Sequence, residues 1–196
     1  MTMPMSETHP LQPFLPQDAQ LLMLGSFPPP KNKWKMNFFY PNYQNDMWRI
    51  MGSIFYQDKD YFLDVEHKMF KLSLIKDFLI THHIAIYDVA AAVIRHQGNA
   101  SDKHLEIVQP IDLKHMLELI PSCQTIMTTG DKATESLMTH FTASTMKPSI
   151  LKSSQTIFHD RALNLYRLPS SSRAYPLALT EKVKAYQHFF EEIGML

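Results

Sequence analysis

The sequence predicts an α/β fold, with three layers (α/β/α) around a central, mainly parallel four-stranded sheet. The first observation is a set of four short apolar runs, typical of strands buried on both faces, at residues 21–24, 84–87, 125–129 and 164–168. The second is that segments with helical periodicity separate these runs, and strands that alternate with helices form parallel sheets. The chain has 196 residues, of which 45% are hydrophobic. This supports one core, so we expect a single domain over residues 1–196.

The first part of the chain is dominated by a loop between a strand and a helix. Residues 1–19 contain four prolines, which predict an irregular N-terminal arm. The strand at 21–24 ends at Gly25-Ser26, because the three consecutive prolines that follow can continue neither a strand ladder nor a helix. After a loop rich in aromatic residues, Asn45-Asp46 can cap a helix over 45–55.

The rest of the chain alternates between helices and strands, and we see no internal repeat. We first expect a helix over 61–80, the strand at 84–87, a helical or irregular piece over 90–95 and a polar loop over 97–102. A helix over 112–119, the strand at 125–129 and a helix over 131–141 capped by Asp131 follow. The chain then has a loop over 142–155, the strand at 164–168 and a closing helix over 179–194.

Composition and charge exclude several classes of protein. The formal net charge is zero, which argues against a surface coated in positive charge but allows a local basic patch. Cys123 is the single cysteine, so an intramolecular disulfide is excluded and a reducing, cytoplasmic setting is expected. The ten histidines show no metal-ligand spacing, so we expect no metal and no cofactor. No signal peptide, membrane span or coiled-coil pattern is visible, and we expect a monomer without a membrane partner.

Three of the predicted strands end in polar or glycine-containing turns. These turns are Gly25-Ser26, Asp88 and Pro169-Ser170. The carboxyl ends of parallel strands lie on one edge of a sheet, and ligands bind in the crevice outside that edge. We therefore expect a composite pocket there, to which the loop over 27–45 and the segment over 170–175 also contribute.

The loop after the first strand contains candidate ligand contacts. Phe38 and Phe39 either plug the core under the loop or offer a stacking face, which contributes on the order of 1–3 kcal/mol for a nucleic-acid base. Asn45 either caps the helix or uses its amide, which is both donor and acceptor, to position water or read the edge of a base. Lys31 and Lys33 are either solvated or in contact with phosphates.

Two later segments also allow either a structural or a functional interpretation. Asp88 either caps the next turn or acts as a site carboxylate. Ser170, Ser171 and Ser172 form either a plain connection or a loop that grips phosphate oxygens, and Arg173 could then reach into a duplex. The sequence has no serine nucleophile elbow, phosphate-binding loop or dinucleotide fingerprint, so an unrelated α/β hydrolase or nucleotide-processing enzyme has no supporting motif.

Four motifs in this order resemble the uracil-DNA glycosylase superfamily, most closely its hypoxanthine-DNA glycosylase and mismatch-specific branch. They are Gly25-Ser26-Phe27-Pro28, the stretch 41–48 (PNYQNDMW), the stretch 84–89 (IAIYDV) followed by Ser101-Asp102, and the stretch 168–172 (LPSSS). The resemblance covers nearly the whole chain after the N-terminal arm. It implies a base pocket at the ends of the strands.

The resemblance also implies roles for the residues of that pocket. Gly25, Ser26 and Phe27 match the first base-binding motif. Phe27 lies where many members of the superfamily place a water-activating Asn or Asp, a group that this chain lacks. Phe38 matches the aromatic residue that stacks on the flipped base, and Phe39 is a close rival.

The remaining roles concern catalysis and DNA binding. Asn45 matches the catalytic Asn of the branch, and Asp88 is a second catalytic candidate. The stretch from Pro41 to Trp48 is two residues longer than is usual in the branch, which leaves Asn42 and Asn37 as alternatives to Asn45. The serine run 170–172 matches the DNA-gripping loop, in which Arg173 replaces the usual proline.

The function that the resemblance implies is removal of a deaminated base, uracil or hypoxanthine, from DNA by a monofunctional glycosylase. The nucleotide would be flipped into the pocket and its N-glycosidic bond hydrolysed without a cofactor. The partner would be DNA that contains damaged or deaminated bases. The alternative is a protein of the same fold that binds lesion DNA but has weak or no catalytic activity, which the apolar Phe27 and the neutral net charge favour.

Overall fold

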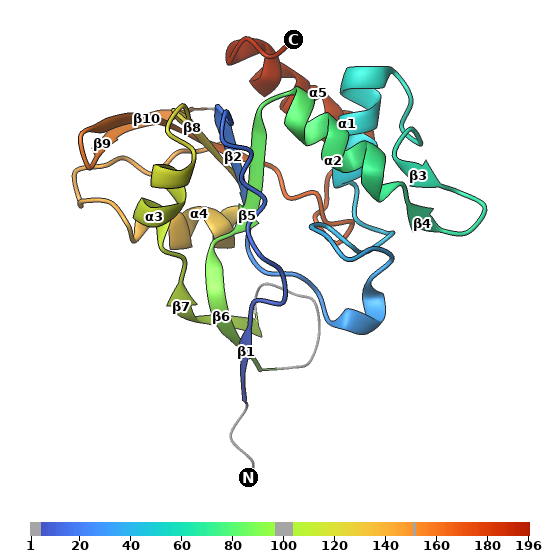
Figure 1. Cartoon of the computed structure of the whole chain (residues 1–196), viewed down its shortest axis with the longest axis horizontal. Helices are drawn as coiled ribbons and strands as arrows, with labels where there is room; N and C mark the ends of the chain where they lie inside the picture. The colour runs from blue at the N-terminus through green and yellow to red at the C-terminus, as the bar shows by residue number, and fades with distance from the viewer. Residues whose placement is uncertain (1–4, 97–103, 151) are drawn as a thin grey trace.

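The structure, a computed structural model, describes residues 5–96, 104–150 and 152–196 (Figure 1). Its centre is a five-stranded sheet in the order β5-β2-β8-β10-β9. In that order the strands are Ile84–Asp88, Leu21–Gly25, Thr125–Thr129, Arg161–Leu168 and Ser154–Phe158. The first four are parallel, as predicted, and β9 is an antiparallel edge strand. The predicted number of four strands is therefore wrong, because β9 alternates half-buried and exposed residues and was not predicted; the expected loop over 142–155 overlaps its start.

Helices cover both faces of this sheet. Figure 1 shows α1 (Met47–Tyr56), α2 (Leu72–Thr81) and α5 (Leu179–Glu192) together on one side, and α3 (Leu113–Leu119) and α4 (Asp131–Met138) on the other. All five residues of β2 and of β5 are buried, which explains their continuous apolar sequences. Within the described ranges, no helix is both long and apolar enough to cross a bilayer.

The predicted helix over 61–80 forms only in its second half. Residues before Leu72 instead make a small hairpin of β3 (Leu63–Asp64) and β4 (Met69–Phe70). The turn between them contains Lys68 at φ 52°, a left-handed conformation that interrupts a helix. Of the apolar residues whose spacing suggested a helix here, Phe62 is buried but Val65 and Met69 are exposed, so the spacing before Leu72 does not mark one buried helical face.

A second sheet lies below the carboxyl end of β5 and contains part of the N-terminal arm. Its three antiparallel strands are, in spatial order, β1 (Ser6–Thr8), β6 (Ala90–Arg95) and β7 (Leu105–Pro110). The expectations of an irregular arm over 1–19 and of a helical or irregular piece over 90–95 are thus wrong at these strands. Backbone pairing supplies the physical reason, since β1 and β6 satisfy each other's hydrogen-bonding groups. The predicted Ser101-Asp102 motif lies outside the described residues.

After β1 the arm follows the edge strand β5. Phe14 and Ile86 exchange two backbone hydrogen bonds, of 3.1 and 2.9 Å. At the start of this path, the backbone N–H of His9 donates to the carbonyl of Ala91 at 2.8 Å. The arm therefore brings residues from the start of the chain to the carboxyl end of β5.

Candidate functional site

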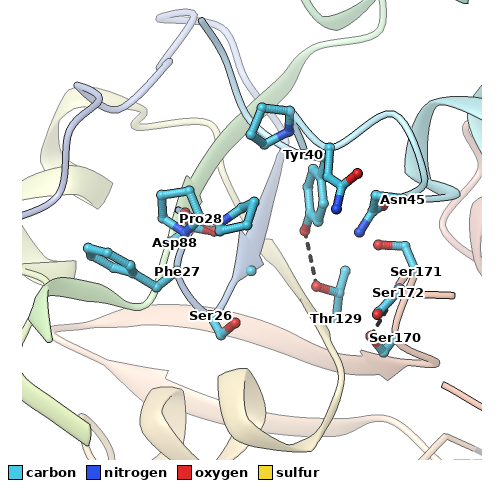
Figure 2. A pocket seen from close by; sticks show the side chains of 14 residues that line it. Ser26, Phe27, Pro28, Tyr40, Asn45, Asp88, Thr129, Ser170, Ser171 and Ser172 are labelled. Atoms are coloured by element: carbon cyan, nitrogen blue, oxygen red, sulfur yellow. Dashed lines mark hydrogen bonds between the residues drawn. The ribbon is translucent and has the colours of Figure 1, made fainter. Parts of the chain in front are cut away.

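A cavity of about 120 Å³ lies at the carboxyl ends of the four parallel strands, where the sequence predicts a composite pocket (Figure 2). It is smaller than the ~300–1,000 Å³ of pockets for drug-sized ligands, so it suits a small ligand. The lining residues come from all four strand ends and from the loop that precedes α1. They are Gly25, Ser26, Phe27, Pro28, Pro29, Tyr40, Pro41, Asn42, Asn45, Asp88, Thr129, Ser170, Ser171 and Ser172.

Gly25 and Asp88 form the floor of this cavity. They are paired in register at the ends of β2 and β5. A Cβ atom on residue 25 would lie 2.4 Å from Oδ1 of Asp88 and 3.1 Å from the hydroxyl of Tyr40. Glycine is therefore required here because the carboxylate and the phenol both lie against the backbone of β2.

Asp88 is held by a residue that the sequence did not single out. Its side chain is buried, and Nε2 of His9 lies 2.8 Å from its Oδ2. The His9 ring is enclosed by Phe27, Tyr87 and Phe39, with ring centroids 5.0, 4.5 and 6.1 Å away. Burial, followed by the Asp88 charge, raises the pKa of Tyr87 to about 12, so this tyrosine stays neutral. No local pattern could have revealed the contact, because 79 residues separate its partners.

Tyr40 forms the aromatic wall of the cavity. Its hydroxyl is 3.0 Å from Oγ1 of Thr129, as Figure 2 shows, and its φ of 53° lies in the left-handed region. A non-glycine residue in that region is strained by about 1–3 kcal/mol and persists only where its surroundings hold it. One signal for Tyr40 was available in the sequence, since it alone among residues 38–40 has a hydroxyl for a partly polar wall.

The prediction that Phe38 or Phe39 forms a face of the pocket is wrong. Their side chains are 5% and 2% exposed, and neither lines the cavity. Phe38 packs edge-on against Phe14, and Phe39 packs edge-on against Tyr87. Both rings belong to the hydrophobic core under the loop, where burial of their apolar surface stabilises the fold.

Asn45 and Asn42 both line the cavity, whereas Asn37 is exposed outside it. Oδ1 of Asn45 accepts the backbone N–H of Met47 at 2.9 Å, and Oδ1 of Asn42 accepts that of Gln44 at 3.0 Å. A backbone N–H can only donate, so the oxygen of each amide is the bonded atom. The NH₂ groups are left to donate towards the cavity.

The serine loop is joined to the start of α1 by a buried ion pair. Nζ of Lys182, on α5, donates to Oδ2 of Asp46 at 2.9 Å and to the carbonyl of Ser172 at 2.8 Å. The Lys182 side chain is 1% exposed. The backbone N–H of Asp46 donates to the carbonyl of Ser171 at 2.9 Å. Because Asp46 directly follows Asn45, this network fixes two walls of the cavity relative to each other.

The three predicted serines occupy one wall, with different exposure. Ser171 is buried, and the hydroxyl of Ser170 accepts the backbone N–H of Ser172 at 3.2 Å (Figure 2). Arg173 extends this loop, and its Nε lies 3.2 Å from Oδ1 of Asp46. Tyr186 on α5 donates to the carbonyl of Pro169 at 2.8 Å. Loop conformation is thus determined by contacts to α1 and α5.

The first motif lies at the cavity, whereas the candidate phosphate contacts Lys31 and Lys33 lie outside it. Gly25, Ser26 and Phe27 line the cavity, although Figure 2 shows the Phe27 ring pointing away from Tyr40 and Asn45. Lys31 and Lys33 lie on the 3-10 helix η1 (Lys31–Lys33), exposed and outside the cavity. Lys31 lies over the ring of Trp34, 4.3 Å from its centroid. The lysines therefore do not contact the floor of the cavity.

The cavity combines a carboxylate, amide donors and an aromatic wall. The carboxylate of Asp88 can stabilise positive charge or accept a proton, and the NH₂ groups of Asn42 and Asn45 can donate to an oxygen or to an anionic ring. Among the residues that the structure describes, no group of three or more His, Cys, Asp and Glu side chains could hold a metal ion. The arrangement fits a reaction in which opposite charges develop at two ends of one bond.

Comparison with known proteins identifies the fold. No protein-family model matches this sequence, and no curated protein matches it significantly. The chain is similar to the solution NMR structure of a protein from Methanosarcina acetivorans that is provisionally assigned as a uracil DNA glycosylase. The TM-score is 0.58 at 21% sequence identity, and the match covers 94% of this chain and 98% of the other. This chain therefore has the same α/β fold as that protein over nearly its whole length.

Proposed function

We propose that this chain is a monofunctional DNA glycosylase of the uracil-DNA glycosylase superfamily, within its hypoxanthine and mismatch-specific branch, that removes uracil or hypoxanthine from DNA. One observation carries the proposal: a single cavity contains residues from all four motifs that suggested the family. The fold shared with the Methanosarcina acetivorans protein supports it.

The cavity would receive one nucleotide flipped out of the duplex. Its small volume, about 120 Å³, is consistent with a flipped base. Tyr40 takes the stacking role that the sequence assigned to Phe38 or Phe39, because Tyr40 lines the cavity and those two residues do not. The rigid loop conformation around Tyr40 would keep this face in place when the base enters.

Asn45 and Asp88 would stabilise the two charges that form as the N-glycosidic bond breaks. The bonding electrons leave with the base, and the sugar acquires oxocarbenium character. The NH₂ of Asn45 donates to the departing base, because its oxygen is engaged by Met47. Asp88 supplies negative charge near the sugar and can accept a proton from the attacking water. Phe27 takes no polar part, so Asp88 replaces the acid or amide missing at that position.

DNA would contact the rim of the cavity. Ser170, Ser171 and Ser172 offer backbone amides and hydroxyls to phosphate oxygens, and Arg173 extends from the same loop. Lys31 and Lys33 are exposed beside the loop that enters the cavity, so they can contact phosphates further along the strand. Binding through this small set of cations is consistent with a net charge of zero.

A base-release panel tests the proposal. Duplexes that contain uracil, hypoxanthine, xanthine or thymine opposite G or T are incubated with excess protein and then treated with alkali. We expect strand cleavage for uracil or hypoxanthine, and a loss of about 10²–10³ in rate for Asn45→Ala, as for removal of one preorganised donor. Asn37→Ala is the matched control, since Asn37 is exposed outside the cavity. Equal rates for Asn45→Ala and wild type would exclude the role of Asn45.

The second candidate is a catalytically weak or inactive protein that binds lesion DNA. The apolar side chain of Phe27, at a position where many superfamily members have a water-activating group, is the observation that favours it. It predicts preferential binding to the same duplexes without base release from any of them. The panel separates the two candidates, because it can be paired with a binding measurement on each duplex.

A further inference from the structure

The buried His9–Asp88 pair connects the N-terminal arm to the cavity. We infer that His9 is a positioning residue, which holds Asp88 with Oδ1 turned to the cavity and thereby sets the carboxylate for bond cleavage. The inference rests on the proposed function for its catalytic consequence. The pairing itself stands on the geometry of His9, Asp88 and Gly25.

The two oxygens of Asp88 have separate surroundings. Oδ2 lies 2.8 Å from Nε2 of His9, on the side of the arm. Oδ1 lies against Gly25, at 2.4 Å from the position that a Cβ would take there, and Asp88 lines the cavity. One oxygen is thus engaged by His9, while the other lies beside Gly25, which also lines the cavity. A carboxylate fixed in this way needs no reorganisation when a cationic sugar forms.

The hydrogen bonds of the imidazole place its proton on Nε2. An ionised Asp88 can only accept, so in the neutral ring Nε2 carries the hydrogen, and Nδ1 accepts the backbone N–H of Leu11 at 3.1 Å. In the protonated ring, Nδ1–H donates to the carbonyl of Leu11 at 3.0 Å, and Nε2 still donates to Asp88. The contact with Asp88 is therefore kept in both states of His9.

The surroundings of His9 restrict its movement. Phe27, Tyr87 and Phe39 enclose the ring, and the His9 side chain is 2% exposed. The Arg95 guanidinium lies 5.9 Å from the centroid of the Phe27 ring and pairs with Glu7. An aromatic enclosure that immobilises an imidazole behind a buried carboxylate fits the rule that a catalytic group is oriented by a third group.

The first test is a set of single-turnover base-release rates for His9→Phe, Asp88→Ala and the double variant. We expect His9→Phe to lose roughly 10²-fold, the effect of a displacement of about 1 Å at a reacting group. His9→Gln should recover most of the rate, because its amide can donate to Asp88 as Nε2 does. If His9 acts through Asp88, the double variant is no slower than Asp88→Ala alone. A further multiplicative loss in the double variant would overturn the inference.

A matched control exists in the same protein. Nδ1 of His83 lies 2.8 Å from Oδ2 of Asp18, but both side chains are exposed and outside the cavity. His83→Phe removes a His–Asp contact of equal length, and we expect no change in rate. A loss in His83→Phe equal to that in His9→Phe would show that the effect is a general one on stability and would refute the positioning role.

An NMR measurement tests the pairing without using activity. Long-range nitrogen–proton correlation spectra of the ¹⁵N-labelled full chain report which ring nitrogen of His9 carries a proton. We expect an Nε2–H donor signature in the wild type that is shifted in Asp88→Ala and unchanged in Asn45→Ala. Identical His9 signals in wild type and Asp88→Ala would overturn the inference. Absence of base release from every duplex would refute the proposed glycosylase instead, while the spectra would still decide whether His9 holds Asp88.

Discussion

A methyl group at position 25 is the most direct perturbation of the site. In Gly25→Ala the new Cβ would lie 2.4 Å from Oδ1 of Asp88, whereas ordinary contacts begin at 3.4 Å, so the carboxylate must retreat by about 1 Å. Gly25 is not among the residues with positive φ, so its backbone accepts alanine and the effect is purely steric. Because Asp88 is held by His9, the retreat also strains that hydrogen bond. We expect a loss of roughly 10²-fold in the rate of base release, with an overpacking cost of about 1–3 kcal/mol.

The assay compares single-turnover base release and thermal unfolding for Gly25→Ala and a control glycine. Gly194 has φ 74° and no atoms within 4 Å of its hypothetical Cβ, so Gly194→Ala costs stability through its backbone and does not touch the site. We expect both variants to lower the melting temperature, but only Gly25→Ala to slow base release. A Gly25→Ala protein with the wild-type rate would refute the requirement for Asp88 at its observed position.

Three further predictions concern buried or half-buried groups outside the floor of the cavity. Lys182→Met leaves Asp46 buried without its main partner and should lower the free energy of unfolding in urea by about 3–5 kcal/mol, whereas Lys184→Met removes only an exposed pair and should change it by less than about 0.5 kcal/mol. Burial raises the pKa of Cys123 to about 11, so a thiol reagent at about pH 8 should modify it only after unfolding, and rapid modification of the native protein would contradict this. Burial also lowers the pKa of His140 below 6.5, so the unfolded chain binds the proton more readily and the free energy of unfolding should fall as the pH drops below 6.5. In urea unfolding, His140→Leu should reduce this loss of stability between about pH 7.5 and pH 5. An unaltered pH dependence would contradict the prediction.

The central strands were predictable because burial on both faces leaves a continuous apolar signature. In β2 and β5 every residue is buried, so local sequence alone indicates a strand. Among the strands that were missed, β6 and β9 have mixed burial and depend on their partners for stability. The same distinction explains the hairpin around Phe62, where tertiary contacts override an apparent helical period.

The site was predictable in its location but only partly in its members. Parallel strand ends bring Gly25, Asp88 and the serine loop to one edge, and that follows from topology. Which aromatic of the loop faces inward does not follow, because Tyr40 reaches the cavity through a left-handed backbone that no propensity favours. The role of His9 could not be predicted for another reason, since it depends on pairing between β1 and β6.

The two groups assigned to catalysis are held by different parts of the fold, and this bears on how the site works. Asn45 is fixed from the α5 side, because Lys182 binds the adjacent Asp46 together with the serine loop. Asp88 is fixed from the opposite end of the chain by His9. A donor for the leaving base and a carboxylate for the sugar must remain apart while charge separates between them, since a direct contact would engage the amide with the carboxylate instead of with the base. Separate buried supports achieve this: neither group can move to the other without breaking a contact that the core already protects from water.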